Sequence, residues 1–148
     1  MERYFAGSPA ETRKIGEKLA KKLLKTKLQK NAFVLGLKGD LGGGKTTFLQ
    51  GFAKGLGSKE KILSPTFVIM KKFVMLSKSN FQKFYHFDCY RISGEKDISV
   101  LGFEKIVSDP QNIVAVEWAE KIRKVLPKGT VWIKFDFVSD KKREITLL

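Results

Sequence analysis

One glycine-rich segment constrains this chain more than any other feature of its sequence. Residues Gly39 to Thr46 read Gly-Asp-Leu-Gly-Gly-Gly-Lys-Thr and fit the pattern G-x-x-x-x-G-K-[ST]. In this pattern the glycines let backbone amides curl around an anion without side-chain clashes. A continuous apolar run, Phe33–Leu37, precedes the segment, and apolar residues at helical spacing follow it from Phe48 to Leu56. A buried strand that turns through glycines into a helix predicts a phosphate-binding site in an α/β protein.

The end of this segment suggests which phosphates are bound. A helix that begins near Lys45 directs the positive end of its dipole toward the phosphates. Lys45 is expected to reach the β- and γ-phosphates, and the Thr46 hydroxyl to ligate magnesium. The sequence has no Asn-Lys-x-Asp segment for guanine, so ATP and Mg²⁺ are the expected cofactors. The loop residues expected to contact the nucleotide are Asp40, Leu41, Gly42, Gly43, Gly44, Lys45, Thr46 and Thr47.

Two carboxylates stand at the ends of further predicted strands. Asp88 follows Phe84–Phe87, and Glu117 follows Ile113–Val116. Ligands of open α/β sheets bind at the carboxyl ends of the strands, so both residues are candidates for the site. Either could hold magnesium or polarise the attacking water, and spacing alone does not separate these roles. His86, two residues before Asp88, is expected on the same face of its strand and could hold Asp88 in position.

A third candidate lies in the loop Ser64-Pro65-Thr66-Phe67. A threonine hydroxyl in such a loop can sense the γ-phosphate through magnesium, as a switch segment does. The alternative is an ordinary turn in which Pro65 restricts the backbone. Cys89 is expected to be a small core residue, and a lone histidine without metal partners argues against a zinc site.

The remaining patterns predict a single domain over residues 1–148 with a three-layer P-loop NTPase sandwich. Its sheet has a parallel centre and antiparallel edge strands. Ser8 is a suitable N-cap for the first helix, with Pro9 in the first position and Glu11 able to close a capping box. The expected strands are 2–6, 33–37, 67–76, 81–87, 113–116, 131–137 and 143–148, and the expected helices are 9–25, 45–56, two pieces within 95–108, and 118–125.

The composition restricts the setting of the protein. The net charge is +14, from 24 Lys and only 5 Arg among the basic residues. Such a charge indicates either a surface for RNA or an acidic protein, or lysines spread over solvated faces. No DNA partner is expected, because specific readers favour arginine. A single cysteine, no signal-like N-terminus and no membrane-length apolar run favour a cytoplasmic protein that does not bind membranes.

Four segments, in this order, resemble the TsaE (YjeE) family of bacterial P-loop ATPases. The loop motif alone is generic, but the other three segments are specific to the family. The resemblance covers nearly the whole chain. The matching segments are Gly39–Thr47, Ser64–Phe67, His86-Phe87-Asp88-Cys89-Tyr90-Arg91, and Val116-Glu117-Trp118-Ala119-Glu120.

The resemblance implies a role for each matching residue. Lys45 and Thr46 become the phosphate and magnesium residues, and Thr66 the switch threonine. Asp88 becomes the magnesium-side carboxylate of a Walker-B-like element. Glu117 becomes the residue that supports hydrolysis, with Trp118 beside it at the site.

The resemblance also implies a biological setting. The family members use ATP to drive a complex of TsaB and TsaD, which makes threonylcarbamoyladenosine in tRNA. They contact the tRNA indirectly, through that complex. This chain departs from the family pattern at Val68, at Lys71-Lys72, at Cys89 and at Ala119. These departures do not affect the phosphate chemistry.

Two alternatives to a partner-dependent ATPase remain open. One is a P-loop kinase for a small molecule, and the other is a nucleotide-gated adaptor that hardly hydrolyses ATP. Kinases of this kind bring several arginines to the transferring phosphate, whereas here only Arg91 is expected near the site. The same shortage predicts slow hydrolysis without partners, because an arginine finger is worth a factor of ~10³ to 10⁵ in rate.

Overall fold

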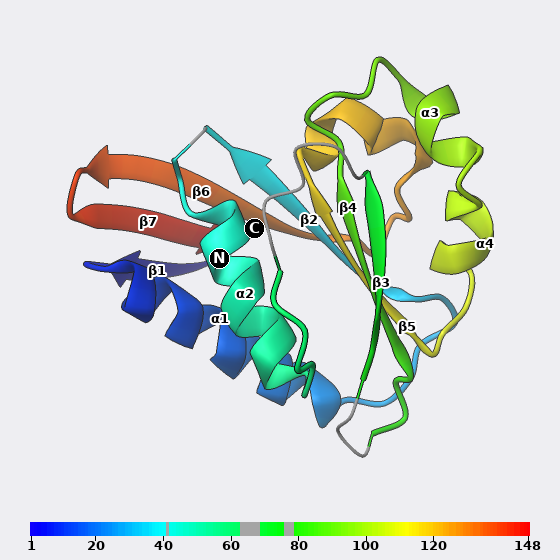
Figure 1. The fold of residues 1–148 in the computed structure, drawn as a ribbon, viewed down its shortest axis with the longest axis horizontal. Coiled ribbons are helices and arrows are strands. Elements are labelled where there is room, and N and C mark those ends of the chain that lie inside the picture. The colour runs from blue at the N-terminus through cyan, green and yellow to red at the C-terminus, as the bar shows by residue number, and fades with distance from the viewer. Residues whose placement is uncertain (41, 63–68, 76–78) are drawn as a thin grey trace.

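The computed structural model describes residues 1–40, 42–62, 69–75 and 79–148, which form one seven-stranded sheet with helices on both faces (Figure 1). The strand order is β1-β7-β6-β2-β5-β4-β3. The four central strands β6, β2, β5 and β4 are parallel, while β3, β7 and β1 run antiparallel to their neighbours. The predicted parallel centre with antiparallel edges is therefore confirmed.

The elements follow the predicted order along the chain. The strands are β1 (Glu2–Ala6), β2 (Phe33–Gly39), β3 (Met70–Val74), β4 (Lys83–Asp88), β5 (Asn112–Glu117), β6 (Val131–Ser139) and β7 (Lys142–Leu147). The helices are α1 (Pro9–Leu24), α2 (Lys45–Gly55), α3 (Glu95–Ser99), α4 (Phe103–Val107) and the 3₁₀ helix η1 (Ala119–Val125).

One predicted strand is longer than the structure shows. The pattern over residues 67–76 predicts a strand, whereas β3 occupies only Met70–Val74. Residues 63–68 and 76–78 lie outside the described part of the chain, and with them Thr66 and part of the connection between β3 and β4.

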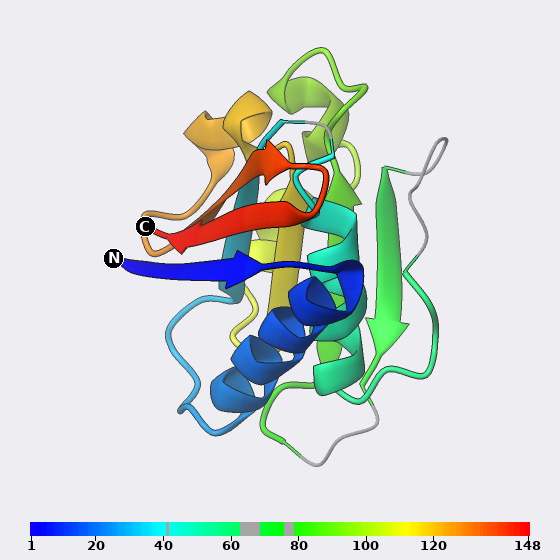
Figure 2. The same cartoon turned by 90° about the vertical axis from the view of Figure 1, so that its left-hand side faces the viewer.

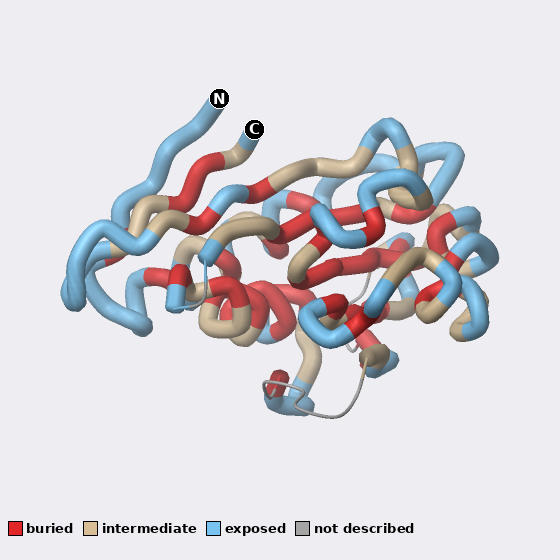
Figure 3. Tube along the Cα trace, turned by 90° about the horizontal axis from the view of Figure 1, so that it is seen from above, coloured by how far each residue is buried: buried red, intermediate tan, exposed pale blue. Residues whose placement is uncertain are grey.

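The two faces of the sheet carry separate apolar cores. Helices α1 and α2 lie side by side on one face, as Figure 2 shows, and pack on side chains such as Leu35, Phe84 and Phe135. The shorter helices α3, α4 and η1 cover the other face and pack on Val34, Phe87 and their neighbours. Strands β2, β5 and β4 are buried from both sides, and every residue of β5 is buried, whereas β6 is exposed along part of its length. The buried residues gather in the middle of the molecule (Figure 3). Continuous apolar runs are typical of strands buried from both sides.

Local signals set the start of α1. The Ser8 hydroxyl accepts a hydrogen bond from the Glu11 amide at 3.2 Å, and Pro9 occupies the first turn. The Glu11 carboxylate reaches back to the Gly7 amide at 2.5 Å. The predicted N-cap is confirmed, although the reciprocal bond goes to the residue before the cap.

Many basic side chains of the first helix face the solvent. Five lysines of α1 and its end, Lys14, Lys18, Lys21, Lys22 and Lys25, are exposed. In the described part of the chain, no helix has the length and apolar character that crossing a membrane requires.

Glycines allow α1 and α2 to approach closely. A Cβ atom at Gly51 would lie 1.9 Å from the Arg13 carbonyl oxygen, and one at Gly16 would lie 2.2 Å from the Phe48 carbonyl oxygen. Backbone atoms cannot move aside as flexible side chains do, so both positions require glycine. The close contact fixes α2, and with it the loop that precedes α2, against α1.

We expect Gly51→Ala to lower the free energy of unfolding by about 1–3 kcal/mol, because overpacking outweighs the better helix propensity of alanine. Urea denaturation measures this change. Gly129→Ala is the control, since a Cβ atom added at Gly129 would have no other atom within 4 Å. A Gly51→Ala protein as stable as the Gly129→Ala protein would contradict the close approach.

Candidate phosphate-binding site

The glycine-rich segment forms the turn between β2 and α2, at the carboxyl edge of the sheet. Gly42 and Gly44 have positive φ angles of 78° and 97°, which side chains disfavour. Gly44 is the N-cap of α2 and offers no side chain to the helix amides. The first amides of a helix lack intrahelical acceptors, so this end of α2 can donate to a ligand. The predicted loop is thus present in the described residues, and Leu41 lies outside them.

Lys45, the first residue of α2, folds back over the turn. Its Nζ donates to the carbonyl oxygens of Gly39 at 2.6 Å and Asp40 at 2.8 Å. The same Nζ lies 4.3 Å from the centroid of the Trp118 ring, a cation–π distance. Burial lowers the pKa of Lys45, while Glu117 and nearby acidic groups oppose this shift. An ammonium held only by carbonyls and an aromatic face would gain from an anion.

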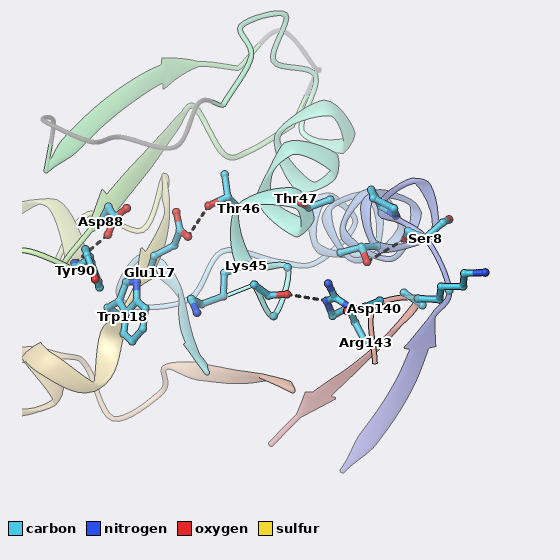
Figure 4. A pocket seen from close by; sticks show the side chains of 18 of the residues that line it. Ser8, Lys45, Thr46, Thr47, Asp88, Tyr90, Glu117, Trp118, Asp140 and Arg143 are labelled. Atoms are coloured by element: carbon cyan, nitrogen blue, oxygen red, sulfur yellow. Dashed lines mark hydrogen bonds between the residues drawn. The ribbon is translucent and has the colours of Figure 1, made fainter. Parts of the chain in front are cut away.

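The next residue joins a buried polar chain. The Thr46 hydroxyl donates to Glu117 Oε1 at 2.9 Å, and Glu117 Oε2 lies 2.7 Å from His86 Nε2 (Figure 4 shows the Thr46 bond). The side chains of His86 and Glu117 are each only 3% exposed. The sequence suggests that His86 could hold Asp88, and this interpretation is wrong. His86 does share a face with Asp88, but its ring turns to the carboxylate on the adjacent strand.

Asp88 lies at the same edge, opposite Glu117 in the register of β4 and β5. Its Oδ1 accepts a hydrogen bond from the Tyr90 amide at 2.9 Å. Burial raises the pKa of Asp88, and the neighbouring Glu117 carboxylate adds to the rise. Both predicted carboxylates therefore lie at the edge of the sheet that faces the glycine-rich turn. Of the two, Glu117 is hydrogen-bonded to the start of α2, through the Thr46 hydroxyl.

Trp118 enters the site through an unusual backbone conformation. In the described ranges it is the non-glycine residue with a positive φ, 57°. Its ring packs against Tyr90, with 5.1 Å between ring centroids. A left-handed conformation of a bulky residue is strained, and such strain is most often found at functional sites. Trp118 thus lies beside Lys45, at the edge of the sheet where the sequence analysis expects it.

A cavity of about 590 Å³ joins these groups, and it is wide enough for a ligand the size of a nucleotide. One end is lined by Lys45, Thr46, Asp88, Glu117 and Trp118. The other end lies between the start of α1 and the β6–β7 hairpin. It is lined by Ala6, Gly7, Ser8, Pro9, Thr12, Asp140, Lys141 and Arg143. The sequence predictions missed this second end.

Arg143 is the clearest correction. We expected only Arg91 near the site, whereas both Arg91 and Arg143 line the cavity. The Arg143 Nε donates to the Gly42 carbonyl oxygen at 2.7 Å, and its guanidinium lies 4.3 Å from the Phe137 ring centroid. The hairpin is thereby tied to the glycine-rich turn. Nothing in the local pattern signals this contact, because 101 residues separate the partners.

The side chains fit a magnesium ion that shares its coordination with a bound ligand. No cluster of three or more His, Cys, Asp or Glu side chains suited to a metal occurs in the described ranges. Thr46, Glu117 and Asp88 nevertheless offer hard oxygen atoms at the end of the cavity beside Lys45. Magnesium is typically bound by one or two carboxylates together with substrate phosphates and water. Cys89 takes no part: it is fully buried, and burial raises its pKa to about 12.

The fold and the site together define a class: a mixed α/β protein with a glycine-rich strand-to-helix turn and two carboxylates at the carboxyl edge of its sheet. Residues 6–145 match the family model described as threonylcarbamoyl adenosine biosynthesis protein TsaE. The chain therefore belongs to the TsaE family. The resemblance drawn from the four segments is confirmed.

Individual relatives agree with this assignment. The chain is 37% identical over 139 residues to the tRNA threonylcarbamoyladenosine biosynthesis protein TsaE of Bacillus subtilis. The aligned region covers 94% of this chain and 80% of that protein. The chain is 32% identical over 135 residues to the protein of the same name from Haemophilus influenzae, covering 91% and 81%. The crystal structure of Bacillus subtilis YdiB is similar, with a TM-score of 0.75 and 33% identity over 99% of this chain and 83% of that chain.

Asp88→Asn is expected to raise the melting temperature near neutral pH. Burial raises the pKa of Asp88 above its unfolded value, so the ionised carboxylate destabilises the folded state above that pKa. The gain should shrink as the pH falls through the folded pKa, because protonated Asp88 resembles asparagine. Thermal melts over a pH series measure both effects.

Asp97→Asn provides a control of opposite sign. Hydrogen bonds from Ser93 lower the pKa of Asp97, so its ionised form stabilises the fold and the variant should melt lower. Equal shifts in both variants would contradict the assignment for Asp88.

Proposed function

We propose that this chain is a P-loop ATPase that binds Mg·ATP at the turn between β2 and α2. The observation that carries the proposal is the uncapped start of α2, where Lys45 and Thr46 face the carboxyl edge of the sheet beside Glu117. Free amides, an ammonium group and a hydroxyl next to a carboxylate are the groups that hold a triphosphate and its cation.

Phosphate binding would reorganise few groups. The amides at the start of α2 and in the turn donate to the phosphates. Lys45 exchanges the carbonyls of Gly39 and Asp40 for the β- and γ-phosphates, which compensates the buried ammonium. Magnesium, when bound, neutralises charge on the phosphates. Thr46, Glu117 and Asp88 are the side chains that would hold it.

The second end of the cavity suits the nucleoside. It lies on the far side of the glycine-rich turn from Asp88, between Ser8, Thr12 and the hairpin residues Lys141 and Arg143. We infer that the ribose and adenine extend toward the start of α1. The hairpin would then contribute to nucleotide affinity although it is remote in sequence.

Hydrolysis requires a polarised water near the γ-phosphate. Glu117 and Asp88 are the carboxylates in reach, and Thr66 remains the proposed switch residue. Glu117 already accepts a hydrogen bond from the Thr46 hydroxyl, and its other carboxylate oxygen contacts the His86 ring. Arg143 is committed to the Gly42 carbonyl, so a partner that supplies or frees a cation would accelerate a slow intrinsic reaction.

The proposed role is to support threonylcarbamoyladenosine modification of tRNA in the cytoplasm, together with TsaB and TsaD. Membership of the TsaE family supports the pathway, and relatives at 32–37% identity carry its name. The tRNA would be contacted through the complex. A nucleotide-gated adaptor with little turnover is the second candidate. The observation that favours it is that Arg143, which lines the cavity, is bonded to the Gly42 carbonyl and so does not point its charge at a transferring phosphate.

Lys45→Ala and Glu117→Gln separate binding from turnover. Lys45→Ala removes charge-assisted hydrogen bonds worth about 1.5–3 kcal/mol, so ATP affinity should fall roughly ten- to a hundredfold. Glu117→Gln keeps the shape of the side chain, so ATP should still bind while turnover falls by about 10². Calorimetry and phosphate release measure the two quantities. Glu120→Gln, exposed and close by, is the charge control; wild-type turnover in Glu117→Gln would refute the role of Glu117.

Reconstitution tests the biological role. We expect ATP turnover to rise when TsaB and TsaD are added, and repeated rounds of tRNA modification to depend on this protein. Phosphate release and modified-nucleoside analysis by mass spectrometry measure both. Equal ATPase rates with and without partners would favour the kinase alternative if a small-molecule acceptor is phosphorylated, and the adaptor if both rates are negligible.

A further inference from the structure

We propose that His86 is a positioning residue that, through Glu117, orients the Thr46 hydroxyl toward the magnesium site. The inference rests on the proposed Mg·ATP binding and adds a residue to it. It follows from the buried chain His86–Glu117–Thr46, whose two contacts measure 2.7 Å and 2.9 Å.

The chain joins three elements. His86 lies on β4, Glu117 ends β5, and Thr46 is in the first turn of α2. In the register of the two parallel strands Glu117 stands opposite Asp88, and His86 stands opposite Ala115. The Glu117 side chain thus turns back along the sheet to meet the histidine. Each carboxylate oxygen receives a group from a different element, so the carboxylate cannot rotate without losing a bond.

Hydrogen-bond chemistry fixes the direction of the chain. An ionised carboxylate only accepts, so with Glu117 ionised the hydrogen between Glu117 and His86 lies on Nε2. The Thr46 hydroxyl has one hydrogen, which it gives to Oε1, and its lone pairs are left for a cation. His86 holds the acceptor, and the acceptor holds the hydroxyl. Groups that orient metal ligands in this way typically change metal affinity 10–100-fold when removed.

A purely structural role is the competing explanation. A buried histidine could serve only to satisfy a buried carboxylate, and its loss would then reduce stability alone. The two roles differ in one measurable quantity, the magnesium dependence of nucleotide binding. Phe84 offers a matched control, because it lies two residues earlier on the same face of β4, is fully buried, and packs in the apolar core.

The test compares His86→Gln, His86→Asn and Phe84→Leu with the wild type. Glutamine can place an amide donor near the position of Nε2, whereas asparagine is too short to reach Glu117. Calorimetry with a non-hydrolysable ATP analogue gives the affinity at graded magnesium concentrations and in EDTA, and thermal melts give stability.

We expect His86→Asn to need about 10–100-fold more magnesium for half-maximal binding, with unchanged affinity in EDTA. His86→Gln should recover most of this loss. Phe84→Leu should melt lower and keep the wild-type magnesium dependence. Turnover at limiting magnesium should follow the same order, with the effect reduced at saturating magnesium.

Two results would overturn the inference. One is a wild-type magnesium dependence in His86→Asn. The other is a change that follows the loss of melting temperature equally in His86→Asn and Phe84→Leu, which would make the histidine structural. Failure of the proposed function is distinguishable, because it would appear in the wild type as nucleotide binding that does not respond to magnesium.

Discussion

The rest of the site depends on the uncapped N-terminus of α2. The chain leaves the centre of the sheet at the end of β2, turns through glycines, and starts a helix whose first amides have no side-chain acceptor. Such amides are costly unless they meet water or an anion. The parallel strands β4 and β5 bring Asp88 and Glu117 to this edge, so the helix amides and the two carboxylates meet by topology and not by sequence proximity.

Positioning of this helix depends on packing at a distance from the chemistry. Glycines at the contact between α1 and α2 allow backbone to approach backbone, and the start of α1 reaches the far end of the cavity. The β6–β7 hairpin closes the other side through Arg143 and Gly42. The cavity is therefore built by the first and last elements of the chain around a central turn, which makes its shape a property of the whole fold.

The sequence predicted local features well and long-range contacts poorly. Element order, the cap at Ser8, the buried run of β5 and both carboxylates follow from periodicity and strand ends. The contact of His86 with Glu117 could not be predicted in this way. The alternation of side chains places His86 on one face of the sheet but does not say which neighbouring strand its ring turns to. Arg143 was missed because the position of the hairpin depends on the strand order β1-β7-β6, which no local pattern specifies. Thr66 lies outside the described residues and stays a prediction.

The position of the Trp118 indole beside Lys45 has a practical consequence for fluorescence spectroscopy. This indole lies against the ammonium of Lys45, and the only other indole, that of Trp132, lies on β6 and does not line the cavity. An excited indole is sensitive to a nearby charge, so departure of the lysine toward a phosphate would alter its emission. Replacing Trp132 with phenylalanine would leave Trp118 as the one tryptophan, whose emission can be excited selectively over tyrosine, and the chain would then report the movement of its own lysine without any attached dye.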